Sequence, residues 1–423
     1  MPSTKLSNLA ETLIGSEIVK LGADIKEKIK QGKKIYNYTI GDFDSSVFPI
    51  PAELENEIIA AYKNHHTTYP PAEGIAELRD AVAIFIQTRE GIAFNADEIL
   101  IAAGGRPLIY AAYRAIVDKA DKVIYAVPSW NNNHYVHFTE GEHVVIETKV
   151  QNNFMPTAAE IKPHLKGASL LALCSPLNPT GTTFTKAALE AICDLVIAEN
   201  KLRGEAEKKL YLLYDQIYWT LTHGRIQHYN PVSLKPAMKG YTIFIDGISK
   251  AFASTGVRVG WAMGPSYLIS RMKAINSHLG AWAPMAEQNA VAKYLLQAAA
   301  IDIYLSNFKS ELEERLNIIY VGFQQLKTAG FSVDAIAPQA AIYLTVQIDL
   351  VGKITNEGKI LTEQTDVTAY LLNEATLAIV PFSAFGASAT SSWYRLSVGA
   401  SKKKEISEML AKLKAALEKL SAR

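Results

Sequence analysis

Short apolar runs alternate with helical patterns through the middle of the chain, from about residue 98 onward. Apolar runs of this kind are typical of parallel strands that helices cover on both faces. The predicted strands are Ile99–Ala103, Val123–Val127, His143–Glu147, Leu170–Cys174, Leu210–Tyr214, Thr242–Asp246 and Val257–Met263, and the predicted helices are Leu108–Val117, Lys186–Glu199 and Glu287–Gln297. The pattern therefore predicts an α/β fold. A large domain over residues 51–300 would contain a seven-stranded, mostly parallel sheet covered by helices.

The two ends of the chain predict a second, smaller unit. The N-terminal end offers an amphipathic helix over Thr12–Ile29 and a short strand over Ile35–Ile40, and a further helix, Pro51–Tyr62, follows them. The C-terminal end offers a long helical stretch, Ile301–Ala329, then the strands Ala341–Ile348, Ala378–Pro381 and Trp393–Val398, and the amphipathic helix Lys403–Ser421. We expect residues 301–423 to form a small α+β domain, with residues 1–50 supplying an N-terminal arm and part of that domain.

The composition is that of a folded protein with ample buried core. Of the 423 residues 49% are hydrophobic, and 43 Lys and Arg balance 42 Asp and Glu to a net charge of +1. This balance argues against nucleic acid as a main partner. No run of eighteen apolar residues predicts a membrane helix, the N-terminus has no signal-peptide pattern, and two cysteines make no disulfide framework. We therefore expect a cytoplasmic protein with no membrane partner.

Several common site motifs are missing. The sequence contains no G-x-G-x-x-G, G-x-x-x-x-G-K-[ST], H-E-x-x-H or G-x-S-x-G, which weakens the dinucleotide, P-loop, zincin and hydrolase hypotheses together. The nine histidines show no metal-ligand spacing supported by cysteines or paired carboxylates. We expect no metal site.

The most informative stretch surrounds Lys250, which follows an apolar strand closely. Open α/β sheets bind ligands at this edge of the sheet. A buried lysine there has a depressed pKa, and its neutral amine can attack a carbonyl. Ser249 beside it, Arg258 eight positions on and the small residues between them would let a phosphate approach. The alternative is that Lys250 is an ordinary surface lysine. The neighbouring Ser249 and Arg258 and the small residues between them argue against it.

Three other places in the sequence predict groups that would bind a charged ligand. Asp215 ends an apolar strand, where an unpaired carboxylate would be costly. Arg395 lies inside an apolar strand, so that its guanidinium needs a planar anion, either a ligand or a structural carboxylate. Gly105 and Arg106 open a helix after a strand, and backbone N–H groups at a helix N-terminus bind anions such as phosphate.

The segment Ser249-Lys-x-x-x-x-x-Gly-x-Arg-x-Gly-Trp261 resembles the lysine segment of the class I/II, fold-type I aminotransferases, aspartate aminotransferase among them, which use pyridoxal 5′-phosphate (PLP). Further matches follow in the same order along nearly the whole chain: Ser175-Pro-Leu-Asn-Pro-Thr-Gly181, Tyr214-Asp-Gln-Ile-Tyr218, Ala102-Ala-Gly-Gly-Arg-Pro-Leu108 and Trp393-Tyr-Arg-Leu-Ser-Val398. The chain departs from the family pattern at Phe43, Pro107 and Gly247.

The resemblance implies a role for each matching residue. Lys250 would bind PLP covalently and serve as the general base, and Asp215 would pair with the pyridine nitrogen. Asn178 and Tyr218 would donate to the phenolic oxygen of the cofactor, and Trp130 would stack on its ring, although core packing is the competing explanation for both aromatic residues. The phosphate would rely on Gly105, Arg106, Ser249 and Arg258, and the substrate carboxylate on Arg395, with Asn178 and the Gly41 backbone beside it.

The resemblance also implies assembly and activity. Tyr69, in Tyr69-Pro-Pro-Ala-Glu-Gly74, matches a tyrosine that reaches the phosphate of the neighbouring subunit, which implies a homodimer with shared active sites. The implied activity is ping-pong transfer of an amino group from an L-amino acid to a 2-oxo acid such as 2-oxoglutarate. Two alternatives are a PLP-dependent carbon–sulfur β-lyase and a non-catalytic PLP-binding protein. Phe43, Trp282 and Tyr343 are candidates for an apolar pocket, which favours a neutral or aromatic amino acid.

Overall fold

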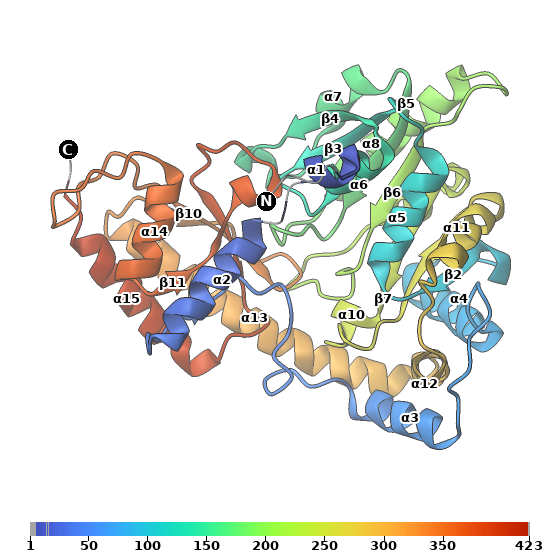
Figure 1. Cartoon of the computed structure of the whole chain (residues 1–423), viewed down its shortest axis with the longest axis horizontal. Coiled ribbons are helices and arrows are strands. Elements are labelled where there is room, and N and C mark those ends of the chain that lie inside the picture. The colour runs from blue at the N-terminus through green and yellow to red at the C-terminus, as the bar shows by residue number, and fades with distance from the viewer. Residues whose placement is uncertain (1–5, 14, 16, 422–423) are drawn as a thin grey trace.

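The large sheet has seven strands. A computed structural model of the chain describes residues 6–13, 15 and 17–421 (Figure 1). In sheet order the strands are β2 (Ile99–Ala102), β8 (Gly260–Met263), β7 (Thr242–Gly247), β6 (Tyr211–Asp215), β5 (Ala168–Cys174), β3 (Lys122–Val127) and β4 (Glu142–Glu147). β8 is antiparallel to both its neighbours, and the remaining pairs are parallel. The predicted seven-stranded, mostly parallel sheet is thus confirmed.

Helices cover both faces of this sheet. Along β2, Leu100 and Ala102 join one hydrophobic cluster and Ile99 and Ile101 the other, because successive side chains of a strand point to opposite faces. The first cluster is completed by α5 (Gly105–Ile116), α6 (Asn132–Thr139) and α11 (Ser266–Leu279). The second includes residues of α3 (Ala52–Lys63), α4 (Ala76–Glu90), α8 (Lys186–Leu202), α12 (Met285–Leu295) and α13 (Ala298–Thr328). The sheet is therefore the buried middle layer of the large domain.

The smaller α+β domain contains both ends of the chain. Its four-stranded sheet has the order β12 (Val380–Pro381), β13 (Trp393–Ser397), β10 (Tyr343–Ile348) and β9 (Val333–Ala335), with α14 (Gln364–Glu374) and α15 (Ile406–Glu418) beside it. From the N-terminal end, β1 (Tyr36–Asn37) pairs in parallel with β11 (Leu377–Ala378), and α2 (Glu17–Lys30) packs on this region through Ile25. The prediction that both ends build this domain is confirmed.

The long helix α13 runs between the two domains, from beside α12 towards the small domain (Figure 1). Its 31 residues bury apolar side chains such as Leu305, Leu312 and Ile319 along one stripe. The remaining short helices are α1 (Asn8–Thr12), α7 (Ala158–Ile161), α9 (Pro231–Leu234) and α10 (Ile248–Ala251).

Some predicted boundaries are wrong. The segment Ala378–Pro381 is not one strand, because Ala378 pairs with β1 and Val380 with β13 in a different sheet. The strand predicted over Ile35–Ile40 is shorter in the structure, where only the two residues of β1 pair with β11. The helix predicted from Thr12 begins at Glu17, after Gly15, a poor helix former; Ile14, part of that prediction, lies outside the described residues.

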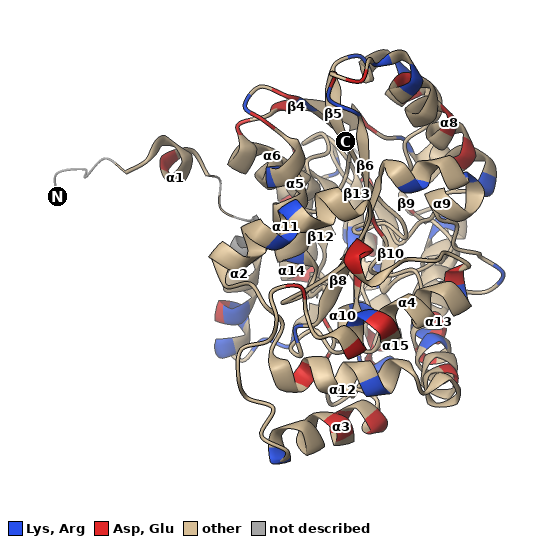
Figure 2. Cartoon of the chain, turned by 90° about the vertical axis from the view of Figure 1, so that its right-hand side faces the viewer, with Lys and Arg blue, Asp and Glu red and all other residues tan. Residues whose placement is uncertain are grey.

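Positions of Lys and Arg and positions of Asp and Glu are interspersed along the helices and loops in Figure 2, and the net charge of the chain is +1. Within the described residues, no helix is both long and apolar enough to cross a membrane.

Candidate active site

A cavity of about 750 Å³ opens at the carboxyl ends of β5, β6 and β7, next to β10 and β13 of the small domain. Every site residue predicted from the sequence lines it except Tyr69, namely Gly41, Gly105, Arg106, Trp130, Asn178, Asp215, Tyr218, Ser249, Lys250, Arg258 and Arg395. Residues from seven separate segments therefore meet at the sheet edge where α/β folds place ligands.

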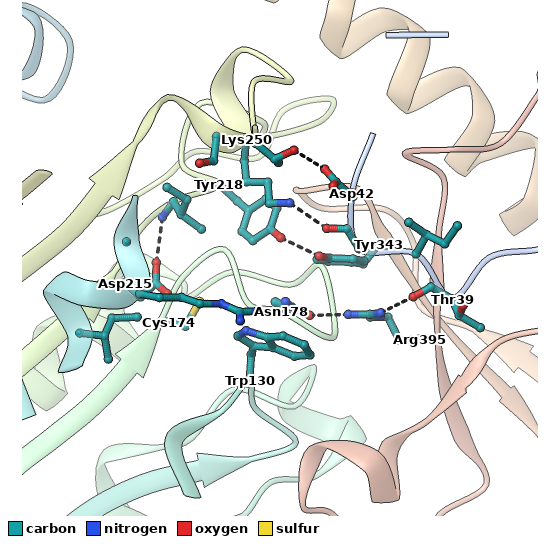
Figure 3. Close-up of a pocket in the computed structure, with 18 of the residues that line it drawn as sticks. Thr39, Asp42, Trp130, Cys174, Asn178, Asp215, Tyr218, Lys250, Tyr343 and Arg395 are labelled. Carbon is teal, nitrogen blue, oxygen red and sulfur yellow. Dashed lines mark hydrogen bonds between the residues drawn. The ribbon is translucent and has the colours of Figure 1, made fainter. Parts of the chain in front are cut away.

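Lys250 lies in α10, the single helical turn that follows β7. Its side chain points into the cavity, where Nζ donates a 2.7 Å hydrogen bond to the Gly41 carbonyl (Figure 3). Burial lowers the pKa of this amine to about 8, an effect that Asp42 opposes and that Arg395, Arg106 and Arg258 reinforce. A substantial fraction of Lys250 is then neutral near pH 8, as a nucleophilic amine requires.

Asp215 is the last residue of β6, and its carboxyl group also faces the cavity. Burial raises its pKa to about 6, and a 3.1 Å hydrogen bond from the Ile217 N–H to Oδ1 partly offsets that effect. In the described part of the chain no cation lies within ion-pair distance of this carboxylate. A cationic group of a ligand would stabilise its charged form.

Arg395 enters the cavity from β13 and is only 2% exposed. Nη1 donates to Asn178 Oδ1 at 3.1 Å and Nη2 to the Thr39 carbonyl at 2.7 Å (Figure 3), while Nε has no partner among the described residues. The guanidinium lies 4.9 Å from the centroid of the Tyr343 ring and 4.8 Å from that of Phe385. It is thus held in place without a carboxylate, which leaves its charge available to an anionic ligand.

Tyr218 makes a 2.6 Å hydroxyl–hydroxyl hydrogen bond with Tyr343 of β10. Burial raises the pKa of both phenols, so that both keep their protons at neutral pH. Because one hydroxyl group can donate while it accepts, this pair retains a donor for a ligand in the cavity.

Gly105 and Arg106 at the start of α5, together with Arg258, form a candidate anion-binding site that we call the anion cradle. The helix begins at Gly105, which places Pro107 in the first turn, where an N–H would have no helical partner. The Arg258 guanidinium donates to the carbonyls of Thr255 at 2.8 Å and Ala103 at 2.7 Å, and the backbone φ of Arg258 is 63°. Gly104 has a φ of 84°, a conformation that favours glycine, and a Cβ there would lie 2.4 Å from Arg258 Nη2 and displace that guanidinium.

Trp130 lies at the side of the cavity beneath Asp215 and Asn178 in Figure 3. The Arg106 guanidinium sits 5.6 Å from its ring centroid, within cation–π range. Arg106 forms no ion pair within the described residues, so its charge is available at the cavity wall.

Tyr69 is the predicted site residue that the fold does not bring to the cavity. Its side chain is 85% exposed and packs edge-on against Trp282, with 5.5 Å between the ring centroids. Both residues line a second cavity of this chain, separate from the one that Tyr343 lines, so a contribution of Trp282 to the substrate pocket stays a prediction. Phe43 does lie near the site, 5.5 Å from Lys250 Nζ to the ring centroid.

Sequence reasoning missed several residues that line the cavity: Lys26, Thr39, Asp42, Asn132, Tyr135, Cys174 and Thr255. Asp42 directly follows the predicted Gly41, and Thr255 lies three residues before the predicted Arg258, and that proximity was the available signal. Lys26 and Thr39 reach the cavity only because the N-terminal segment crosses the small domain, which no local pattern reveals. In the described residues, no cluster of three metal-binding side chains occurs.

Known proteins resemble the chain over almost all of its length. The model of the family "Aminotransferase class I and II" matches residues 33–413. This chain belongs to that family. An aspartate aminotransferase of Rhizobium meliloti (strain 1021) is 28% identical, over 99% of this chain and 97% of the relative. Another from Geobacillus stearothermophilus is also 28% identical, over 90% and 92% respectively.

Solved structures of the same family share the fold. The crystal structure of the aspartate aminotransferase from Rhizobium meliloti superposes with a TM-score of 0.89 at 28% identity, covering 99% of this chain and all of that one. The Thermus thermophilus aspartate aminotransferase with maleate gives a TM-score of 0.85 at 25% identity, over 98% and 100%. The protein is an aminotransferase, an enzyme that transfers amino groups between amino acids and keto acids.

Proposed function

We propose that this aminotransferase uses PLP held covalently by Lys250. The observation that carries the proposal is the buried Lys250 amine, whose pKa is lowered to about 8, in one cavity with a buried carboxylate and an anion cradle. PLP is an aldehyde with a basic ring nitrogen and a phosphate, so each of its polar groups has a complementary partner there. The buried Asp215 and the space that a Cβ at Gly104 would fill support this fit.

The residues of the cavity suggest how the cofactor would be held. Asp215 would pair with the ring nitrogen, and Asn178 and Tyr218 would donate to the phenolic oxygen. Trp130 would cover one face of the ring. The phosphate would take hydrogen bonds from Ser249, Arg258 and the backbone N–H groups of Gly105 and Arg106.

The chemistry divides between cofactor and protein. Bound PLP withdraws electrons from the α-carbon of the amino acid. Arg395 would bind the substrate α-carboxylate, since its guanidinium is buried and has no carboxylate partner among the described residues. Lys250 Nζ would serve as the base for the α-proton of the substrate, since its amine is buried in the same cavity as Arg395. The Gly41 carbonyl, which accepts from Nζ at 2.7 Å, would orient that amine.

Covalent binding of PLP is directly testable. Purified protein supplied with PLP should develop the absorption band of a lysine-bound cofactor, and borohydride should fix the cofactor onto Lys250, as peptide mass spectrometry would show. Lys250→Ala should show neither the band nor the adduct, whereas Lys273→Ala, a lysine on α11 outside the cavity, should show both. An unlabelled Lys250 in the wild-type protein would reject the proposal.

We further propose a dicarboxylic amino donor such as L-aspartate, with 2-oxoglutarate as acceptor and ping-pong kinetics. Arg106 and Lys26 line the cavity without ion-pair partners in the described part of the chain, and either can meet a second carboxylate. The relatives named aspartate aminotransferase support the same class. The proposal departs from the neutral or aromatic substrate expected from sequence, because these two cations line the cavity.

A panel of amino donors assayed with 2-oxoglutarate tests the substrate. Aspartate should give the highest kcat/KM, and double-reciprocal plots should be parallel, as a ping-pong mechanism requires. A preference for phenylalanine or leucine would contradict the dicarboxylate proposal. Continuous release of pyruvate and ammonia from a cysteine derivative would indicate β-elimination instead.

We also propose that the protein is a cytoplasmic homodimer with shared active sites. Tyr69 supports this assembly because it is 85% exposed and lies away from its own cavity, where it is free to enter a partner's site. The free thiols of Cys174 and Cys193 fit a reducing compartment.

We propose domain limits at residues 50 and 300. The second limit lies close to Ala298, where α13 begins.

A further inference from the structure

The loop of residues 40–44, which follows β1, lies against the residues that surround Lys250. Its Gly41 carbonyl accepts from Lys250 Nζ at 2.7 Å, and Asp42 Oδ1 accepts from Thr255 Oγ1 at 2.6 Å (Figure 3). Asp42 Oδ1 also accepts from the Phe43 N–H at 2.8 Å. The two segments are more than 200 residues apart in sequence, so they are held together only by these tertiary contacts and by packing.

The loop is anchored on its other side to the small domain. Asp44 N–H donates to the Gly399 carbonyl at 3.0 Å, and a Cβ at Gly399 would lie 2.2 Å from the Asp42 carbonyl oxygen. Thr255, by contrast, lies in the segment that runs from Lys250 to Arg258 in the large domain. The Asp42–Thr255 hydrogen bond therefore joins the small-domain loop to the segment that carries the lysine.

The charge of the Asp42 carboxylate favours the protonated form of Lys250. The groups that face the lysine amine are Asp42, Arg395, Arg106 and Arg258, together with the rings of Phe43 and Tyr218. The three arginines and burial all favour the neutral amine, and Asp42 opposes them. Its carboxylate is fixed by two donors, Thr255 and Phe43, rather than free to rotate towards solvent.

We propose that Asp42 is a positioning residue for Lys250, held in place by Thr255, and that this pair sets the location and charge of the lysine amine before the cofactor binds. The proposal rests on the proposed function, because it assumes that Lys250 is the residue to which PLP becomes attached. Asp42 touches neither cofactor nor substrate in this role. It acts through the loop and through its charge.

The test measures how fast PLP becomes covalently attached to the apo protein at a series of pH values. Borohydride traps the attached cofactor at each time point. Asp42→Asn keeps the acceptor for Thr255 but removes the charge, so the pH at half-maximal rate should fall by about one unit. Attachment at pH 6.5 should consequently be faster than in the wild type. Thr255→Val removes the donor and should slow attachment about tenfold at every pH, and Thr255→Ser should restore the rate.

Asp44→Asn is the matched control, because it removes a charge from the same loop where the carboxylate bonds only to Ser46 among the described residues. It should leave the profile unchanged. A profile for Asp42→Asn with the wild-type midpoint, or an Asp44→Asn profile shifted equally, would overturn the proposal. Failure of the proposed function would look different, since the wild-type protein itself would then take up no PLP on Lys250.

Discussion

At the scale of single residues, the cavity is notable for buried charges that lack a protein counter-ion. Arg395 is 2% exposed and bonds only to neutral oxygens in the described structure, and burial raises the pKa of Asp215 to about 6. Burying an uncompensated charge costs free energy. An anion bound at Arg395 and a cation bound at Asp215 would lower this free-energy cost. The site therefore favours ligands that carry both charges.

Arg395→Lys should lower kcat/KM for the amino acid by about 10- to 100-fold, chiefly through KM, because a lysine cannot reproduce the planar pair of donors. Steady-state kinetics with several donor concentrations would measure the change. Arg271→Lys, at an exposed position of α11, is the matched control and should behave as wild type. An unchanged KM for Arg395→Lys would place the α-carboxylate elsewhere.

At the scale of elements, the sheet edge depends on close approach of backbones. β8 and the loop before α5 come so near that a Cβ at Gly260 would lie 2.7 Å from the carbonyl carbon of Gly104. Backbone atoms cannot rotate away as a side chain can. The anion cradle is therefore held in position by the packing of two glycine-containing segments.

Gly260→Ala should lower the free energy of unfolding by about 1–3 kcal/mol, since the added methyl group overpacks this contact. It should also weaken PLP binding, because the cradle would shift. Chemical denaturation and cofactor titration measure the two effects. Gly240→Ala, with no atom within 4 Å of the added methyl group, should change neither; equal effects in both variants would show that the contact does not hold the cradle.

A second buried polar cluster joins α4 to the strands behind the cavity. Gln216 donates to Glu90, the last residue of α4, and Trp219 Nε1 donates to Asp246 of β7 at 2.7 Å. His228 Nε2 lies 3.8 Å from Glu90, too far for a hydrogen bond. Burial raises the pKa of Glu90 to about 8 and lowers that of His228 to about 3, so the two side chains are both neutral near pH 7 and form no ion pair.

The raised pKa of Glu90 predicts how stability depends on pH. Between its ordinary value of 4.5 and about 8, the folded protein keeps a proton that the unfolded chain has released. The free energy of unfolding contributed by this group must then fall as pH rises through that range. Glu90→Gln should remove this contribution, flattening the slope by up to about 1.4 kcal/mol per pH unit.

Urea denaturation of the apo protein at several pH values between 5 and 8 would measure the slope. The exposed Glu77→Gln, also on α4, is the control and should keep the wild-type slope. A Glu90→Gln slope identical to wild type would mean that Glu90 is ionised in the folded protein.

At the scale of the whole molecule, the cavity lies next to strands of both domains and has contributions from both chain ends. Arg395 and Tyr343 come from the small domain, whereas Lys250 and Asp215 come from the large one. Any relative movement of the domains therefore changes the site. The proposed dimer adds a further contribution, in which Tyr69 of each subunit serves the other.

Mixing two inactive or weakened variants tests the shared site. Tyr69→Phe should lower PLP affinity about tenfold by removing a hydroxyl that donates to phosphate, and Lys250→Ala should bind no PLP covalently. After the two are unfolded and refolded together, hybrid dimers should contain one site with both Lys250 and Tyr69 intact. Activity at limiting PLP should then exceed that of either variant alone.

Hybrids formed from wild-type protein and Lys250→Ala provide the reference for complete recovery. Sedimentation should show a dimer in each case. A monomeric protein with full activity, or no recovery in dimers shown to be hybrid, would contradict the shared site.

The local features of this protein can be predicted from its amino-acid pattern. Continuous apolar runs predicted the seven strands, because strands buried on both faces need apolar side chains on both. The ends of those strands pointed to Lys250 and Asp215, whereas Asn178 followed from the family resemblance. Both chain ends were assigned to one domain by their α+β pattern. These features depend on neighbours in sequence, which a pattern can report.

Which distant segments meet follows from the packing of the folded chain. The split of residues 378–381 between two sheets depends on the partners β1 and β13, and the contact of Asp42 with Thr255 joins residues 213 positions apart. Trp282 and Tyr69 were likewise separated from the cavity by packing. Burial and charge at a position are set by everything around it in space, so the lowered pKa of Lys250 takes its size from the folded chain.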